Sequence, residues 1–141
     1  MRLACLVTAA LFLVGLAGCG GDGLVLVPVS GRVLIDGAPL TYGHVRFVPD
    51  DARPSGGHLD KDGRFKLTYS DGRDGAVLGR HRVEIFAAEV QGGAMHWHAP
   101  KEYRSFETSG LETTIDGEID SVELNLTWKG AQPFNEAIEQ E

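Results

Sequence analysis

The tetrapeptide Met95-His96-Trp97-His98 holds the residue types of this chain that are best suited to metal chemistry. Two imidazoles at positions i and i+2 of an extended segment share one face, and the neighbouring thioether suits Cu(I). A zinc ion would need a third ligand, either a carboxylate or one of three other histidines with no distinctive spacing: His44, His58 and His81. Copper or zinc binding by His96 and His98, with Met95, is therefore the alternative function. The main interpretation assigns no metal and no cofactor, because Trp97 packing on the fold explains the same segment.

Catalytic motifs are missing from the sequence. The chain has neither a Gly-x-Ser-x-Gly elbow nor a His-Glu-x-x-His pair. Glu84 and Glu89 could pair as the carboxylates of a hydrolase, but their places on strand faces account for them. The segment 60–63, Asp-Lys-Asp-Gly, resembles the start of a calcium loop without the later ligands, and a hairpin turn explains it. We therefore expect a protein that is not an enzyme.

A third group of residues is suited to binding rather than to chemistry. Aromatic and arginine side chains are concentrated in protein-binding surfaces. Within residues 88–120 the sequence places four of them close together: Trp97, Tyr103, Arg104 and Phe106. These four form the candidate binding surface. In the competing interpretation, Trp97, Tyr103 and Phe106 fold back and cover an open sheet edge.

The N-terminus has the pattern of an export signal. Met1-Arg2 precedes a run of about fifteen apolar residues, which is the length of a secretory signal core and too short for a spanning helix. Leu16-Ala17-Gly18-Cys19 resembles a bacterial lipobox, which implies cleavage before Cys19 and acylation of its thiol. An ordinary signal peptide with an incidental Cys19 is the alternative. The pattern predicts a signal peptide over 1–18 and an acylated cysteine with a tether over 19–28.

Charge and cysteine content agree with a protein anchored in the cell envelope. Removal of residues 1–18 loses only Arg2 among the charged residues, so 20 acidic and 12 basic residues remain, a formal charge of −8. Such a chain is a poor partner for nucleic acid. Cys5 is removed with the signal, so Cys19 has no partner for a disulfide. We expect attachment to a membrane through lipid on the exported side, and Gly20 favours the outer membrane.

The rest of the chain has the pattern of short strands. Apolar residues alternate with polar ones over 29–35, 44–49, 64–69, 81–87 and 122–128, the period of half-buried strands. Six of the ten aspartates precede glycine, which is typical of tight turns in an all-β chain. Residues 88–120 are predicted to be irregular except for an edge strand at 111–115. A helical turn or a frayed end is expected over 134–141. The expected inward-facing residues are Val33, Ile35, Val45, Phe47, Phe65, Leu67, Val83, Ile85, Leu124 and Leu126.

Several of these segments are similar to the carboxypeptidase-regulatory-like domain. The similarity spans about residues 28–128, and Pro100-Lys101-Glu102-Tyr103 is similar to a segment of small bacterial lipoproteins with this domain. His81 stands where the family usually has an aromatic residue. The segments that carry the resemblance are Val29-Ser30-Gly31-Arg32-Val33, Asp36-Gly37-Ala38-Pro39-Leu40, Val45-Arg46-Phe47-Val48-Pro49, Asp62-Gly63-Arg64-Phe65 and Gly79-Arg80-His81-Arg82-Val83.

The resemblance implies a single seven-stranded Greek-key β-sandwich of the transthyretin (prealbumin) type over 29–129, followed by a C-terminal tail over 130–141. It does not imply a catalytic site, because such a domain usually serves as an accessory or binding module. We therefore expect a lipid-anchored envelope protein that acts as a non-catalytic binding or structural module. Its expected partners are the membrane, through the lipid, and an envelope protein or glycan.

Overall fold

The computed structural model describes residues 23–139, so the predicted signal peptide and Cys19 lie outside the described residues. This part of the chain forms strands and turns, with one short 3-10 helix, η1 (Lys101–Arg104), and no α-helix. The prediction of an all-β protein is confirmed. No helix in residues 23–139 combines the length and the apolar composition that crossing a bilayer requires.

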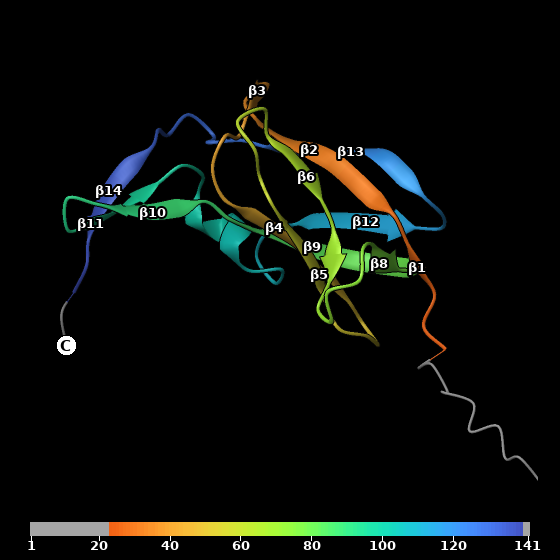
Figure 1. Ribbon diagram of the computed structural model, residues 1–141. Helices are drawn as coiled ribbons and strands as arrows, with labels where there is room; N and C mark the ends of the chain where they lie inside the picture. The colour runs from red at the N-terminus through yellow and green to blue at the C-terminus, as the bar shows by residue number, and fades with distance from the viewer. Residues whose placement is uncertain (1–22, 140–141) are drawn as a thin grey trace, which may run out of the picture.

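The larger sheet has five antiparallel strands in the order β12-β9-β4-β5-β7 (Figure 1). Its strands are β4 (His44–Pro49), β5 (Ser55–His58), β7 (Thr68–Tyr69), β9 (Gly79–Phe86) and β12 (Leu111–Ile115). Strand β12 pairs with β9 alone and lies at the edge of the sheet, so the predicted edge strand at 111–115 is confirmed.

The second sheet is built around β2 (Val29–Ile35). Strand β13 (Ile119–Leu126) pairs with it in parallel on one side, and β3 (Ala38–Pro39) and β6 (Arg64–Lys66) pair antiparallel on the other. The approach of β2 to β13 requires a glycine, because a Cβ at Gly31 would lie 2.0 Å from the carbonyl oxygen of Val122. The pairing also shifts register between Ile119 and Val122, beside this contact.

The core lies between the two sheets. Phe47 of β4 and Phe65 of β6 meet there, with ring centroids 5.9 Å apart. His81 is fully buried beside Phe47 and its Nε2 lies 2.8 Å from the carbonyl oxygen of Val77. Nine of the ten predicted inward-facing residues are buried, and Ile35 is half-buried against the same core. The strand register inferred from the sequence is therefore correct.

The turn at 60–63 is a hairpin turn, as predicted. Asp60 Oδ1 accepts hydrogen bonds from the backbone N–H groups of Asp62 (2.8 Å) and Arg64 (2.9 Å). These bonds lower the pKa of the Asp60 carboxyl. Gly63 has φ of 73°, in the left-handed region that glycine tolerates. The Asp60 carboxylate, which would be the first ligand of a calcium loop, is therefore engaged in hydrogen bonds with the backbone of its own turn.

Two smaller sheets complete the fold. Strands β1 (Leu26–Val27) and β8 (Ala76–Val77) form a short ribbon. At the opposite end of the molecule, β10 (Ala88–Gln91), β11 (Ala94–Trp97) and β14 (Phe134–Ala137) form an antiparallel sheet in that order (Figure 1). We call it the terminal sheet.

The terminal sheet corrects two expectations. Most of residues 88–104 is not irregular, because 88–97 forms a β-hairpin and 101–104 forms η1. The C-terminal segment forms neither a helical turn nor a free tail. Instead its side chains alternate between the two faces of β14, and its backbone pairs with β11 from Phe134 to Ala137.

Candidate functional site

The terminal sheet separates the residues of the Met95–His98 segment onto two faces. Trp97 lies opposite Ala88 and Phe134 in the register, and we call their side the aromatic face. His96 lies opposite Glu89 and Asn135, and we call their side the histidine face. Side chains alternate along a strand, so Met95 points to the aromatic face and is not brought together with His96 and His98.

On the aromatic face, the Trp97 ring is enclosed from several directions. It is 3% exposed, stacks on Phe134 at 6.3 Å with an interplanar angle of 17°, and meets the Phe86 ring edge-on at 5.7 Å. Helix η1 places two cations near the indole, with Lys101 Nζ at 5.4 Å and Arg104 Cζ at 5.9 Å from the ring centroid. The aromatic and cationic residues therefore serve first to dock the terminal sheet against η1.

Glu136 connects β14 to the elements beside it. Its Oε2 accepts a hydrogen bond from Trp97 Nε1 at 3.0 Å, and its Oε1 forms an ion pair with Lys101 Nζ. The hydrogen bond from Lys101, followed by the one from Trp97, lowers the pKa of the Glu136 carboxyl. An acidic side chain thus sits between the aromatic ring and the lysine and links β11, β14 and η1.

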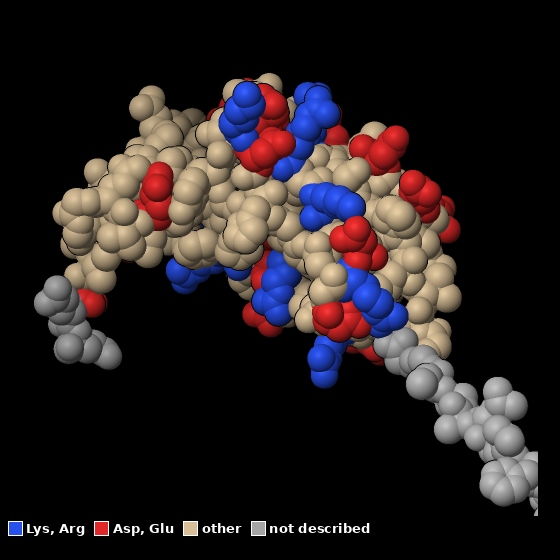
Figure 2. All heavy atoms as spheres, viewed as in Figure 1, with Lys and Arg blue, Asp and Glu red and all other residues tan. Residues whose placement is uncertain are grey.

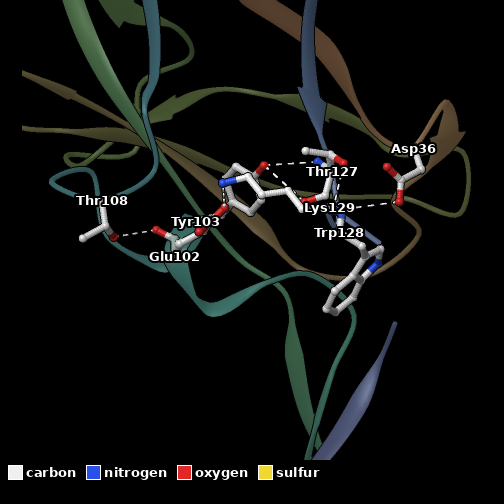
Figure 3. Close-up of polar contacts among 7 residues, drawn as sticks. All are labelled: Asp36, Glu102, Tyr103, Thr108, Thr127, Trp128 and Lys129. Atoms are coloured by element: carbon white, nitrogen blue, oxygen red, sulfur yellow. Dashed lines mark hydrogen bonds and ion pairs between the residues drawn. The ribbon is translucent and has the colours of Figure 1, made fainter. Parts of the chain in front are cut away.

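Tyr103 fixes η1 to the end of β13 (Figure 3). Its hydroxyl accepts a hydrogen bond from the backbone N–H of Thr127 at 3.1 Å and lies 3.4 Å from the carbonyl oxygen of the same residue. Lys129 Nζ pairs with Glu102 at 3.2 Å, and the Trp128 N–H donates to Asp36 Oδ2 at 3.3 Å. The segment after β13 is therefore held between η1 and the turn that follows β2.

The four residues of the predicted binding surface lie in different environments. Trp97 and Tyr103 are buried, whereas Arg104 is exposed. Phe106 is half-buried beneath Arg82, whose Cζ lies 4.2 Å from its ring centroid. The fold-covering interpretation therefore accounts for Trp97 and Tyr103, and only Arg104 and part of Phe106 reach the surface.

The histidine face brings His96 and His98 together, with ring centroids 4.7 Å apart. Each ring also has a partner: His96 Nδ1 lies 2.6 Å from Asn135 Oδ1, and His98 Nε2 lies 2.8 Å from Glu89 Oε1. The bond to His98, with a second from Gln91, lowers the pKa of the Glu89 carboxyl. Within residues 23–139, no group of three or more His, Cys, Asp or Glu side chains is arranged to hold a metal ion.

A second histidine pair lies on the outer face of the five-stranded sheet. His44 of β4 is directly opposite His58 of β5, and their ring centroids are 5.9 Å apart at 67°. Burial, and next the charge of His58, lower the pKa of the His44 imidazole. Both rings line two neighbouring hollows, of about 250 Å³ beside Tyr42 and about 450 Å³ above Gly56 and Gly57.

Comparison with known proteins gives no relative for this chain. No family model matches it, and neither the curated proteins nor the solved structures include a match.

Sequence reasoning missed the partners that complete both faces of the terminal sheet. Asn135 and Glu136 belong to a four-residue strand whose only signal is a brief alternation after Phe134. It also missed the His44–His58 pair, because 14 positions separate the two residues and only the β4–β5 register places them opposite each other. The spacing of Gly56 and Gly57 before His58 indicated a turn or loop rather than a strand.

Proposed function

We propose that this chain is a cell-envelope lipoprotein, anchored through an acylated Cys19, whose domain is a non-catalytic binding module. The sequence from 1 to 22 supports the anchor, because it places a cysteine directly after small residues at the end of an apolar run. The apolar run ends in Gly20-Gly21-Asp22-Gly23, which supplies a tether between the anchor and the first strand.

We assign the domain to the seven-stranded Greek-key, transthyretin-like class, in the manner of carboxypeptidase-regulatory-like domains. Support comes from the places of the resembling segments. Val29–Val33 lies on β2, Asp36-Gly37 forms the turn after it, and Val45–Pro49 lies on β4. Two facing sheets, with β6 and β7 as consecutive pieces of one chain segment, provide seven main strands within residues 23–139: β2, β4, β5, β6–β7, β9, β12 and β13.

One observation carries the binding role: the terminal sheet exposes large apolar side chains. Val90 is 62% exposed and Phe134 is 38% exposed, and the register places both on the aromatic face. Figure 2 shows acidic and basic side chains mixed over the sandwich and few of either at the end that carries the terminal sheet. Large apolar side chains that are exposed on one face of a sheet support an interaction site there. The partner that we propose is an envelope protein or a glycan.

Site-specific photo-crosslinking in envelope membranes tests this function. A photoreactive phenylalanine analogue at position 134 should give a discrete cross-linked product. The same analogue at position 78 is the matched control, because Leu78 is 47% exposed and directly follows β8, which lies at the opposite end of the molecule from the terminal sheet (Figure 1). Equal products at both positions, or none at position 134, would show that the aromatic face is not a binding surface.

Metal binding by His96 and His98 is the second candidate function, and it rests on the 4.7 Å separation of their rings. The internal hydrogen bonds of both rings oppose it, because a metal ion must compete with Asn135 and Glu89 for the nitrogens. Loss of copper or zinc binding in a His96→Gln/His98→Gln variant is the result that would favour this function.

A further inference from the structure

The His44–His58 pair has the placement of a chelating pair. Residues directly opposite in antiparallel strands have Cβ atoms about 4.5–5.5 Å apart. The centroid of an imidazole lies about 3 Å from a metal ion that it ligates, so two such rings on one ion are on the order of 5–6 Å apart. The observed separation of 5.9 Å falls in that interval. Strands β4 and β5 hold the backbone of both residues in place.

The nitrogens of this pair are free to ligate. His81, His96 and His98 each have a ring nitrogen within 2.8 Å of a hydrogen-bond partner. His44 and His58 make no such bond within residues 23–139; their ring contacts are with each other and with the Phe86 ring, which lies 5.6 Å from His44. An ion would therefore displace no protein hydrogen bond at this pair.

The hollow beside His44 and His58 leaves room for water, and the two cations that line it are each paired with an acidic side chain. The hollow of about 450 Å³ lies over Gly56, which is opposite Arg46 in the register and therefore on the same outer face as the two histidines. Two cations line this hollow, but Arg46 pairs with Glu84 at 3.1 Å and Lys66 pairs with Asp74 at 2.9 Å. Water can thus complete the coordination of an ion that two imidazoles hold.

We propose that His44 and His58 form a two-histidine site for a divalent transition-metal ion of the Cu²⁺ and Zn²⁺ class. Imidazole nitrogens suit these ions, and the order of affinities at a site without strong geometric constraint places Cu²⁺ above Ni²⁺ and Zn²⁺. With only two protein ligands, the site has moderate affinity and an open side that a further ligand can occupy. This site is independent of the proposed binding role of the terminal sheet.

The test is a titration of the full chain with Cu²⁺ and with Zn²⁺, after alkylation of its two thiols so that they cannot compete. Calorimetry measures affinity, and electron paramagnetic resonance of the copper form detects nitrogen ligands. His44→Gln/His58→Gln removes the pair, and His96→Gln/His98→Gln is the matched control because it removes the other pair of adjacent histidine rings. Circular dichroism establishes that each variant keeps the fold, which is expected since His44 and His58 are exposed.

The proposal expects one ion per chain, two nitrogen ligands, and at least a tenfold loss of affinity in His44→Gln/His58→Gln with less than a threefold change in the control. Every other pattern overturns it. Loss of binding in the control alone would assign the ion to the second candidate function, and no binding by the unaltered chain would exclude both sites. Neither result bears on photo-crosslinking at position 134, so failure of this site and failure of the binding role are separable.

Discussion

The indole N–H of Trp97 donates a hydrogen bond to Glu136 Oε2 over 3.0 Å and thereby ties β11 to the last strand of the domain. Phe134, two residues before Glu136, stacks on the same indole ring. The burial of Trp97 therefore depends on β14. The segment 134–137, which has the composition of a C-terminal tail, is therefore an edge strand of the terminal sheet.

Replacement of Trp97 by alanine is expected to destabilise the protein. Loss of a buried tryptophan costs about 3–5 kcal/mol in free energy of unfolding, because a large cavity replaces its packing. Urea denaturation followed by circular dichroism measures the cost. Trp128→Ala is the control, since Trp128 is half-buried and should cost less. If Trp97→Ala leaves the unfolding midpoint unchanged, the ring does not dock the terminal sheet.

Acidification is expected to loosen β14. Lys101 and Trp97 lower the pKa of Glu136, so its folded-state pKa lies below the unfolded value near 4.5. Such a carboxylate adds stability above the unfolded pKa, and this stability is lost as the pH falls through the folded pKa. Trp97 fluorescence in a Trp128→Phe background should report the change below about pH 4.5. The change in Trp97 fluorescence should be absent in the Glu136→Gln variant. If the change persists there, it arises from the titration of another group.

Replacement of Phe47 by alanine is expected to cost about 3–5 kcal/mol in free energy of unfolding, because the ring is fully buried where the two sheets meet. That loss is a large share of the stability of a small domain. Thermal and urea denaturation measure it. Phe106→Ala, at a half-buried position, should cost clearly less, and equal costs would contradict the assigned core.

Removal of the Tyr103 hydroxyl is expected to weaken the attachment of η1 to the end of β13. Tyr103→Phe keeps the packing and leaves the backbone N–H of Thr127 without its partner, at a cost of about 1–2 kcal/mol. Tyr42→Phe is the matched control, because Tyr42 is 41% exposed and should tolerate the change. Hydrogen exchange at Thr127 provides a local readout. Unchanged protection there would show that the hydroxyl does not hold this segment.

Acylation of Cys19 predicts a mature chain that starts at this residue and fractionates with membranes. Intact-mass analysis of membrane-fraction protein should show the lipid. Cys19→Ala should abolish the mass increment and release the protein from the membrane. An unmodified chain with a different N-terminus, released equally in both forms, would contradict the anchor.

The strands of the sandwich could be predicted because their signals are local. Val45 and Phe47, or Val83 and Ile85, alternate with charged residues, and this period of two defines the inward face without knowledge of the partner strand. Asp-Gly pairs then mark the turns. These signals placed nine core residues correctly, whereas the edge strand at 111–115 was inferred from the length of the segment 88–120.

The candidate sites could not be predicted because they depend on pairing between distant segments. Asn135 and Glu136 come to His96 and Trp97 only through the β11–β14 register, and His58 comes to His44 only through the β4–β5 register. The two glycines before His58 had the composition of a loop. The alternation of apolar and polar residues after Phe134 was too short to distinguish a strand from a turn.

The parallel pairing of β2 with β13 sets the earliest moment at which the domain can fold during synthesis. Val33 near the start of the chain pairs with Leu124 near its end, so the nascent polypeptide cannot close its second sheet until the ribosome has released residue 126. Closure of such long-range pairs is slow. A nascent chain that lacks β13 therefore leaves one edge of β2 without its backbone partner.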